Sequence, residues 1–260
     1  CVFHIYAPED YFTRNESVGI ICRMNIPLLI GAIFFLSAFT QGLSGFGVAL
    51  VAMALLPNII GIKDAIVLVA LVAFVVDFGV LLRYRDSLQF KKVLPLILAS
   101  FVGVPLGIFL LRRADEGLAL AILGITLAGY ALYALSGLRL LELKGKAWAY
   151  GTGFFGGLLG GAYNTPGPPI IMYASCKKWE PDVFKGNLQT FFIQNSIIVI
   201  IGHWASGNFT PDILSIFWRG SPYLLAGLFA GLAMDRWINP EVFRKIVLVL
   251  LVVMGLRLIF

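Results

Sequence analysis

Six long apolar stretches limit what this chain can fold into more than any other feature. They cover residues 65–82, 93–111, 117–138, 188–204, 213–234 and 242–260. A helix that crosses the hydrocarbon core of a bilayer, about 30 Å thick, needs about 20 apolar residues, so each stretch is predicted to be one span. Only 13% of the residues are charged and 59% are hydrophobic, whereas a soluble domain needs about 25% charged residues. The composition therefore excludes a soluble enzyme and a nucleic-acid-binding protein, and it indicates an all-α polytopic protein in a lipid bilayer.

Two further apolar segments are too long for one span and are interrupted near their middles. Residues 26–57 and 147–176 would form straight helices of about 45 Å or more, at about 1.5 Å per residue. The first contains QGLSGFG at 41–47, and the second contains GGAYNTPGPP at 160–169. Glycine and proline at this density break a helix, and non-helical backbone inside a bilayer survives only where it lines a cavity or is buried in protein. We therefore predict two broken or re-entrant helical hairpins.

The two halves of the chain are similar in three blocks that keep their order. The blocks are Gly42-x-x-Gly45 with Gly157-x-x-Gly160, residues 74–77 with 192–195, and Gly103-x-x-x-Gly107 with Gly227-x-x-x-Gly231. They predict a tandem repeat in which each copy is a broken hairpin followed by three transmembrane helices. Repeat 1 covers residues 26–140, repeat 2 covers 141–260, and residues 1–25 are predicted to be extramembrane.

The distribution of Lys and Arg predicts how the hairpins lie in the membrane. If each broken segment crosses the membrane once, the 20 Lys and Arg residues divide 11 to 9 between the two sides. If each returns to its starting face, they divide 13 to 7, and an excess on one side is what the cytoplasmic face of a membrane protein carries. Each repeat then crosses three times, so the second repeat is inverted relative to the first, as in many secondary transporters. The N-terminus is predicted outside a cell (inner or plasma) membrane, and the loop 138–146 inside.

The two breaks are predicted to form the substrate site. A half-helix that begins inside the membrane presents unpaired N–H groups and the positive end of its dipole, which favour a compact anion with several acceptor oxygens. The predicted substrate-binding residues are Gln41, Gly42, Ser44, Gly45, Phe46, Gly47, Gly160, Gly161, Asn164, Thr165, Gly167 and Pro168. The alternative for the glycines is tight helix packing, which is the preferred interpretation for the four glycines at 103, 107, 227 and 231.

Asp77 is the only carboxylate deep inside a predicted span. Acids inside a membrane are costly and mark functional sites, and desolvation favours the protonated form, so Asp77 is a candidate for carrying a coupling proton. The alternative is an acid that is neutralised by a hydrogen bond and serves only helix packing. Gln189, Gln194 and Asn195 are predicted to line the opposite wall. The sequence leaves open whether H⁺ or Na⁺ is the coupling ion and whether the protein forms a homodimer.

The motifs at the breaks resemble those of a known family. QGLSGFG at 41–47, with LLP at 55–57 behind it, resembles the first motif of the TauE/SafE family of sulfite and organosulfonate exporters. GGLLGG at 156–161, followed by GPPI at 167–170, resembles the second. The resemblance covers residues 26–260 and implies a transporter of small anions, often sulfur-containing, that moves them out of the cytoplasm. Residues 162–166 are bulkier and more polar than the glycine-dominated stretch of the family, so their side chains would reach into the proposed site.

Two other functions fit parts of the sequence. One is a small-anion channel on the same scaffold, and the other is a rhomboid-like intramembrane serine protease that uses Ser44 and His203. A serine nucleophile needs its histidine within hydrogen-bond reach, whereas Ser44 is predicted near the midplane and His203 at the outer interface. The cysteines and histidines have no metal-ligand spacing, so neither a metal nor an organic cofactor is predicted. We therefore predict a secondary carrier, not an enzyme, that exports a small anion by alternating access.

Overall fold

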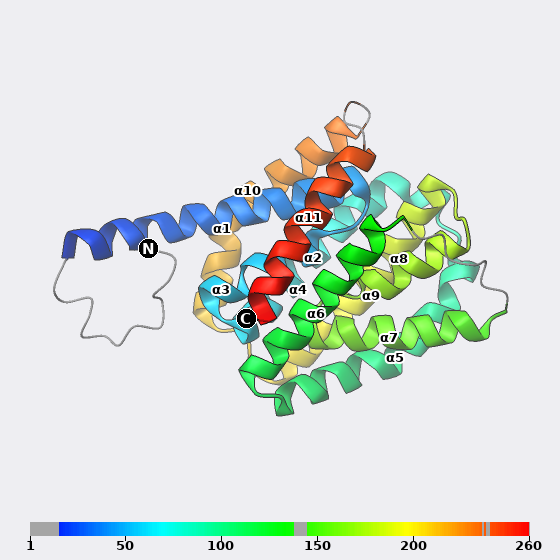
Figure 1. Cartoon of the computed structure of the whole chain (residues 1–260), viewed down its shortest axis with the longest axis horizontal. Coiled ribbons are helices and arrows are strands. Elements are labelled where there is room, and N and C mark those ends of the chain that lie inside the picture. The colour runs from blue at the N-terminus through cyan, green and yellow to red at the C-terminus, as the bar shows by residue number, and fades with distance from the viewer. Residues whose placement is uncertain (1–15, 138–144, 236, 238–239, 260) are drawn as a thin grey trace.

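The structure, a computed structural model, is all-α throughout the part of the chain that it describes, residues 16–137, 145–235, 237 and 240–259 (Figure 1). The helices of the first half are α1 (Glu16–Ser44), α2 (Val48–Leu55), α3 (Pro57–Ile60), α4 (Ile62–Tyr84), α5 (Phe90–Arg113) and α6 (Glu116–Leu135), with the short 3₁₀ helix η2 (Arg85–Ser87) between α4 and α5. Those of the second half are α7 (Ala147–Tyr163), α8 (Gly167–Cys176), α9 (Pro181–Ala205), α10 (Pro211–Met234) and α11 (Pro240–Ile259).

Each predicted span falls in one helix, although α9 and α11 are not among the described segments that are long and apolar enough to cross a membrane. The six apolar stretches lie in α4, α5, α6, α9, α10 and α11. Five segments of the described chain are long and apolar enough to cross a membrane: Ile26–Ser44, Ile62–Ser87, Phe90–Arg113, Glu116–Leu135 and Pro211–Met234. The prediction of an all-α polytopic membrane protein is confirmed. Residues 1–15 of the predicted extramembrane segment, the loop at 138–144 and the predicted span ends at 138 and 260 lie outside the described residues.

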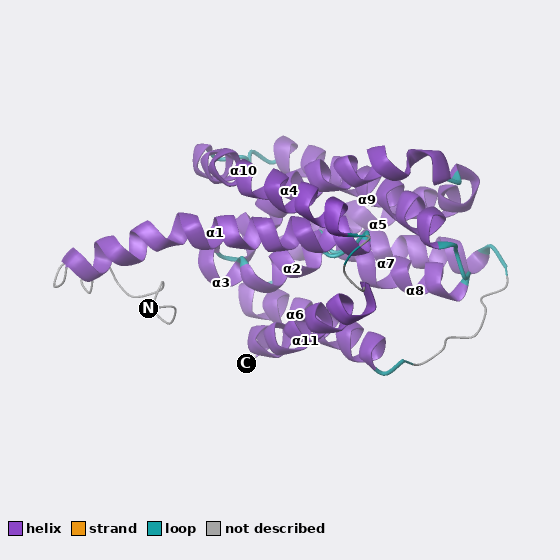
Figure 2. Ribbon diagram, turned by 90° about the horizontal axis from the view of Figure 1, so that it is seen from above, coloured by secondary structure: helices purple, strands orange, loops and turns teal. Residues whose placement is uncertain are grey.

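Both long apolar segments break where the glycine and proline runs occur. α1 ends at Ser44, and the next residues include Gly45 with φ +80° and Gly47 with φ +118°. α7 ends at Tyr163, and Asn164 follows it with φ +55°. Such left-handed residues stop a helix, and glycine and asparagine adopt that conformation most easily. In Figure 2, α2 folds back beside α1 and α8 beside α7, and the two pairs reach the middle of the molecule from opposite ends.

The two halves contact each other in a reciprocal pattern. α5 of the first half packs along α7 of the second, and α10 of the second half packs along α1 of the first. α4 packs against its counterpart α9, and α6 packs against its counterpart α11. Suppose that each helix of the first half corresponds to one of the second half, in the order α1–α7, α2–α8, α4–α9, α5–α10 and α6–α11. A two-fold relation between the halves would then produce these contacts.

Glycines make these reciprocal contacts close. A Cβ added to Gly103 or Gly107 of α5 would overlap a backbone carbonyl oxygen of α7, and a Cβ added to Gly227 or Gly231 of α10 would overlap one of α1. The carbonyl groups, in the same order, belong to Phe154, Leu158, Phe35 and Phe39. The helices can approach this closely only because these positions carry no side chain. The packing interpretation of the four glycines is confirmed.

The packing also corrects the register of the first aligned block. The sequence comparison paired Gly42 with Gly157. In the structure Gly42 lies against the backbone of α10 at Leu228, and the glycine in the matching place is Gly161, which lies against the backbone of α5 at Val104. Gly42 and Gly161 each lie two residues before their helix ends. The predicted pairing was wrong by four residues, about one helical turn, because α7 repeats glycine on the same face.

The glycine contacts predict the stability of alanine variants. Gly107→Ala and Gly231→Ala should each destabilise the protein by about 1–3 kcal/mol, because the overlapping atoms are backbone and cannot rotate away. Gly129→Ala is the matched control: this glycine is exposed on α6 with nothing within 4 Å of an added Cβ, so alanine should be neutral or slightly stabilising. Thermal unfolding of the purified protein in detergent measures the difference. Equal unfolding temperatures for Gly107→Ala and Gly129→Ala would contradict the packing role.

Candidate functional site

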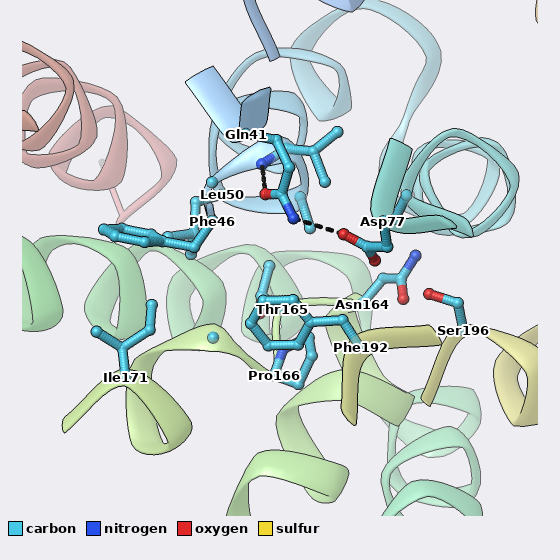
Figure 3. A pocket seen from close by; sticks show the side chains of 15 residues that line it. Gln41, Phe46, Leu50, Asp77, Asn164, Thr165, Pro166, Ile171, Phe192 and Ser196 are labelled. Carbon is cyan, nitrogen blue, oxygen red and sulfur yellow. Dashed lines mark hydrogen bonds between the residues drawn. The ribbon is translucent and has the colours of Figure 1, made fainter. Parts of the chain in front are cut away.

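A hollow lies where the two helix breaks meet, facing α4 and α9 (Figure 3). Its cavity volume is about 20 Å³, room for about one water molecule, so the hollow is nearly closed in this structure. The predicted site residues that line it are Gln41, Phe46, Gly47, Asp77, Asn164, Thr165 and Gly167. Lining residues that the sequence analysis did not identify are Val48, Ala49, Leu50, Ala73, Pro166, Ile171, Phe192 and Ser196. The hollow therefore combines residues from both halves of the chain.

A buried chain of hydrogen bonds connects Asp77 to the first break. Gln41 Nε2 donates to Asp77 Oδ1 at 2.5 Å and to Gln189 Oε1 at 3.1 Å. Gln41 Oε1 accepts a hydrogen bond from the backbone N–H of Val48 at 3.0 Å, so this side chain caps the first turn of α2. Gln189 Nε2 donates to the carbonyl oxygen of Gly45 at 2.6 Å. Two backbone groups of the first break, the Val48 N–H and the Gly45 carbonyl, are thus bonded to buried amide side chains, which hold the break in place.

At the second break, buried polar side chains have no partner. Asn164 is 1% exposed and Thr165 is fully buried, and neither the amide group of Asn164 nor the hydroxyl of Thr165 has a hydrogen bond within the described chain. An unpaired buried polar group costs about 1–3 kcal/mol, so proteins keep such groups where a ligand or water completes them. Figure 3 shows the Asn164 amide extending between Asp77 and Ser196. These groups are available to bind a guest.

The two half-helix N-termini differ in the donors that they supply. α2 begins with Val48, Ala49 and Leu50, and the N–H of Val48 is already bonded to Gln41. α8 begins with Gly167 followed by two prolines, which have no N–H group. The sequence analysis predicted donors at both ends. The prolines leave Gly167 as the only one of the first three residues of α8 with an N–H group, so the other polar groups on that side are the side chains of Asn164 and Thr165.

Four predicted glycines lie outside the hollow and serve close packing. Gly42 and Gly161 lie against α10 and α5, as described above. A Cβ added to Gly45 would meet the aliphatic stem of Lys185, and one added to Gly160 would overlap the side chain of Asn195. These glycines therefore let other chain segments approach the breaks.

The space beside Gly160 explains where Asn195 lies. Asn195 corresponds to Asp77 in the other half, and Gly160 corresponds to Gln41. In the first half, Gln41 reaches Asp77 with its side chain, whereas in the second half Asn195 occupies the space that Gly160 leaves free. Asn195 is fully buried, and its amide has no hydrogen-bond partner among the described residues. It packs behind the second break and does not line the hollow.

The remaining predicted polar residues also face elsewhere. The hydroxyl of Ser44 donates to the carbonyl of Thr40 at 2.7 Å, and Ser44 lines a second, smaller hollow against α11. Gln194 Oε1 accepts a hydrogen bond from Ser100 at 2.8 Å, and neither Gln194 nor Pro168 lines the main hollow. Ser44 and His203, the pair considered for a protease, are bonded to different groups, since His203 Nδ1 lies 2.9 Å from the side-chain nitrogen of Asn208.

A half-buried ion pair covers one side of the first break. Lys185 Nζ lies 2.9 Å from Asp235 Oδ2 and 3.0 Å from the hydroxyl of Tyr84, which itself donates to Asp235 at 2.8 Å. The side chains of Lys185 and Asp235 are 13% and 17% exposed. This cluster ties α4, α9 and α10 together while the Lys185 stem covers Gly45. Its three residues lie far apart in the chain and form no motif, so the sequence analysis could not identify it.

Comparison with known proteins gives one finding. A family model described as sulfite exporter TauE/SafE matches residues 29–258, which is nearly the whole chain. No curated protein and no solved structure matches the chain. The family match confirms the resemblance that the motifs at 41–47 and 156–170 indicate.

The ion-pair cluster predicts how single and double substitutions change the stability of the protein. Asp235→Asn should destabilise the protein by about 1–3 kcal/mol, because it leaves the Lys185 ammonium without its counter-charge. Breaking a fully buried pair costs about 3–5 kcal/mol, and this pair is partly exposed. The double variant Lys185→Met/Asp235→Leu should recover most of the loss. The control is Asp86→Asn, which removes the exposed Arg85–Asp86 pair and should change the stability little. If Asp235→Asn and Asp86→Asn unfold at the same temperature, the cluster does not stabilise the fold.

Proposed function

Since the chain belongs to the sulfite exporter TauE/SafE family, we propose that it is a secondary carrier that moves a small sulfur-containing anion out of the cytoplasm. The family places it among membrane transporters, and the outward direction is taken from the family. The observation that carries the proposal for this chain is the hollow between the two breaks, where Asn164 and Thr165 are buried without hydrogen-bond partners. A transporter needs a site of this kind, closed around its substrate and reachable in turn from each side.

Alternating access is supported by the reciprocal packing of the halves. In the proposed arrangement the second half is inverted, so α1–α2 enters from the outer face and α7–α8 from the cytoplasmic face of the cell membrane. Each hairpin rests on a helix of the other half, α10 or α5. Movement of one hairpin and its partner helix against the other would expose the hollow to one side at a time, as in other carriers with inverted repeats.

The ion-pair cluster fits this proposal as a closure on the cytoplasmic side. Lys185, Asp235 and Tyr84 lie at those ends of α9, α10 and α4 that face the cytoplasm in the proposed topology. Because the Lys185 stem covers Gly45, the first break is shielded from that side while the pair is formed. Opening the hollow toward the cytoplasm would require the pair to separate.

Asp77 fits the role of the proton carrier. It is 2% exposed, lines the hollow, and receives a hydrogen bond from Gln41, an uncharged group. A charged carboxylate in this position repels an anion bound beside Asn164, and protonation removes the repulsion. One proton and one anion would then enter the hollow together.

The site predicts the effect of removing its unpaired polar groups. Asn164→Gly keeps the left-handed turn, as Gly45 does at the corresponding position, but removes the amide. Thr165→Val removes the hydroxyl and keeps the shape. Each should lower sulfite uptake by inside-out membrane vesicles or proteoliposomes at least about tenfold, the effect of losing one hydrogen bond to a charged group. Thr126→Val, in the exposed part of α6, is the matched control and should transport normally. Uptake within twofold of the unmodified protein for both site variants would exclude the proposed site.

Proton coupling makes a separate prediction. Uptake by the unmodified protein should increase as the pH on the loading side falls, because protonated Asp77 admits the anion. Asp77→Asn should still bind the anion but transport it without this pH dependence. Asp64→Asn, an exposed acid at the start of the same helix, should keep the dependence. If uptake by Asp77→Asn depends on pH as strongly as uptake by the unmodified protein, Asp77 has a structural role and does not carry the proton.

A further inference from the structure

We infer that Lys185 and Tyr84 form a second anion site, outside the hollow, in which an oxyanion arriving from the cytoplasm takes the place of Asp235 and so opens the closure. The site lies where α4, α9 and α10 meet. The inference rests on the proposed function and concerns how the hollow is reached.

Lys185 is a positive charge that lies directly against a helix break. A Cβ added to Gly45 would lie 2.7 Å from Cγ of Lys185, so the stem of this side chain packs on the turn after α1. Within the described chain, neither of the two hollows is lined by a lysine or arginine, and the main hollow contains the acid Asp77. Close to the first break, an anion that approaches from the cytoplasm therefore finds its opposite charge at Lys185.

Lys185 and Tyr84 already hold an oxyanion, the carboxylate of Asp235. Lys185 Nζ donates to Asp235 Oδ1 at 3.0 Å and to Oδ2 at 2.9 Å, and the Tyr84 hydroxyl donates to Oδ2 at 2.8 Å. A guest that carries a negative charge and two or three oxygens on one atom can accept the same hydrogen bonds. The two side chains are thus a preformed receptor whose present occupant belongs to the chain itself.

This occupant can leave without unfolding the structure. Asp235 follows Met234, the last residue of α10, so its side chain can turn toward water while the helix stays intact. The side chains of Lys185 and Asp235 are partly exposed, so the pair lies within reach of solvent. Separating the pair without a guest leaves a half-buried ammonium alone, whereas exchange for an oxyanion keeps its charge compensated. Exchange is therefore the less costly way to open the closure.

The start of α9 links this site to the hollow. Phe184, the residue before Lys185, packs edge-on against Phe46 with the ring centroids 6.4 Å apart, and Phe46 lines the hollow. Gln189, one turn after Lys185, donates to the carbonyl oxygen of Gly45 at 2.6 Å. A movement of Lys185 onto an anion therefore acts on a segment that contacts both the break and the hollow. The closure opens for an anion and stays shut without one.

The test is sulfite binding to the purified full-length protein, measured by calorimetry at constant ionic strength and by thermal unfolding. Asp235→Asn removes the built-in occupant, so sulfite should bind at least about tenfold more tightly, the effect of freeing one hydrogen bond to a charged group. Sulfite should also raise the unfolding temperature of this variant more than that of the unmodified protein, because it binds the folded state more tightly. If Asp235→Asn unfolds earlier but binds sulfite with unchanged affinity, the pair serves stability alone and the inference is wrong.

The double variant Lys185→Met/Asp235→Leu separates the anion site from the stability of the closure. It should be more stable than Asp235→Asn, as predicted above. Its KM for sulfite uptake should nevertheless rise at least about tenfold, because the cation beside the break is gone. Lys92→Met, at an exposed lysine in the first turn of α5, is the matched control and should keep the KM of the unmodified protein. An unchanged KM in the double variant would overturn the inference, even if Asp235→Asn does not fold.

A variant of the hollow distinguishes a failure of this inference from a failure of the proposed function. In Asn164→Gly/Asp235→Asn the tighter sulfite binding should remain, since the two sites are separate. If Asn164→Gly abolishes uptake while the Lys185 and Asp235 variants bind and transport sulfite as the unmodified protein does, the inference fails and the carrier function stands. If Asp235→Asn binds sulfite tightly but no form of the protein transports it, the anion site stands and the proposed function fails.

Discussion

Direct backbone contact between the two halves is the constraint on which the rest of this structure depends. α1 lies on α10 and α7 lies on α5 at positions where glycine leaves room for a carbonyl oxygen of the facing helix. In a bilayer, helices gain little from hiding apolar surface from water, so close packing has to supply the attraction. Because each contact joins a broken helix of one half to a continuous helix of the other, the same glycines also fix the two breaks relative to each other and so create the hollow.

The two breaks solve the same backbone problem in different ways. In the first half, Gln41 accepts a hydrogen bond from the Val48 N–H, and Gln189 donates one to the carbonyl oxygen of Gly45. In the second half the place of Gln41 is taken by Gly160, and Asn164 and Thr165 are left without partners. Two halves that pack reciprocally thus differ at their breaks: the first has its polar groups bonded to Gln41 and Gln189, and the second has buried side chains without a partner in the described chain.

The sequence predicted the helices and the breaks because both depend on local chemistry. Runs of apolar residues define the spans, and Gly45, Gly47 and Pro166 interrupt helices wherever the rest of the chain lies. The site was only partly predictable. Asp77, Asn164 and Thr165 were identified as polar residues in apolar surroundings, whereas Phe192 and Ile171 have no polar group that distinguishes them from other lipid-facing or core residues. The cluster of Lys185, Asp235 and Tyr84 required three-dimensional contacts, and the register error at Gly42 arose because glycine recurs along α7.

The prolines at the start of α8 bear on how an unloaded carrier behaves. A carrier that completes a cycle has to return empty, and every donor that a substrate leaves behind raises the free energy of that state by about 1–3 kcal/mol when water cannot replace the substrate. Pro168 and Pro169 have no N–H group to leave unpaired. In the proposed carrier, a half-helix that starts this way leaves two fewer backbone donors unpaired when the hollow is empty, so at this break the cost of the empty state falls on the side chains of Asn164 and Thr165.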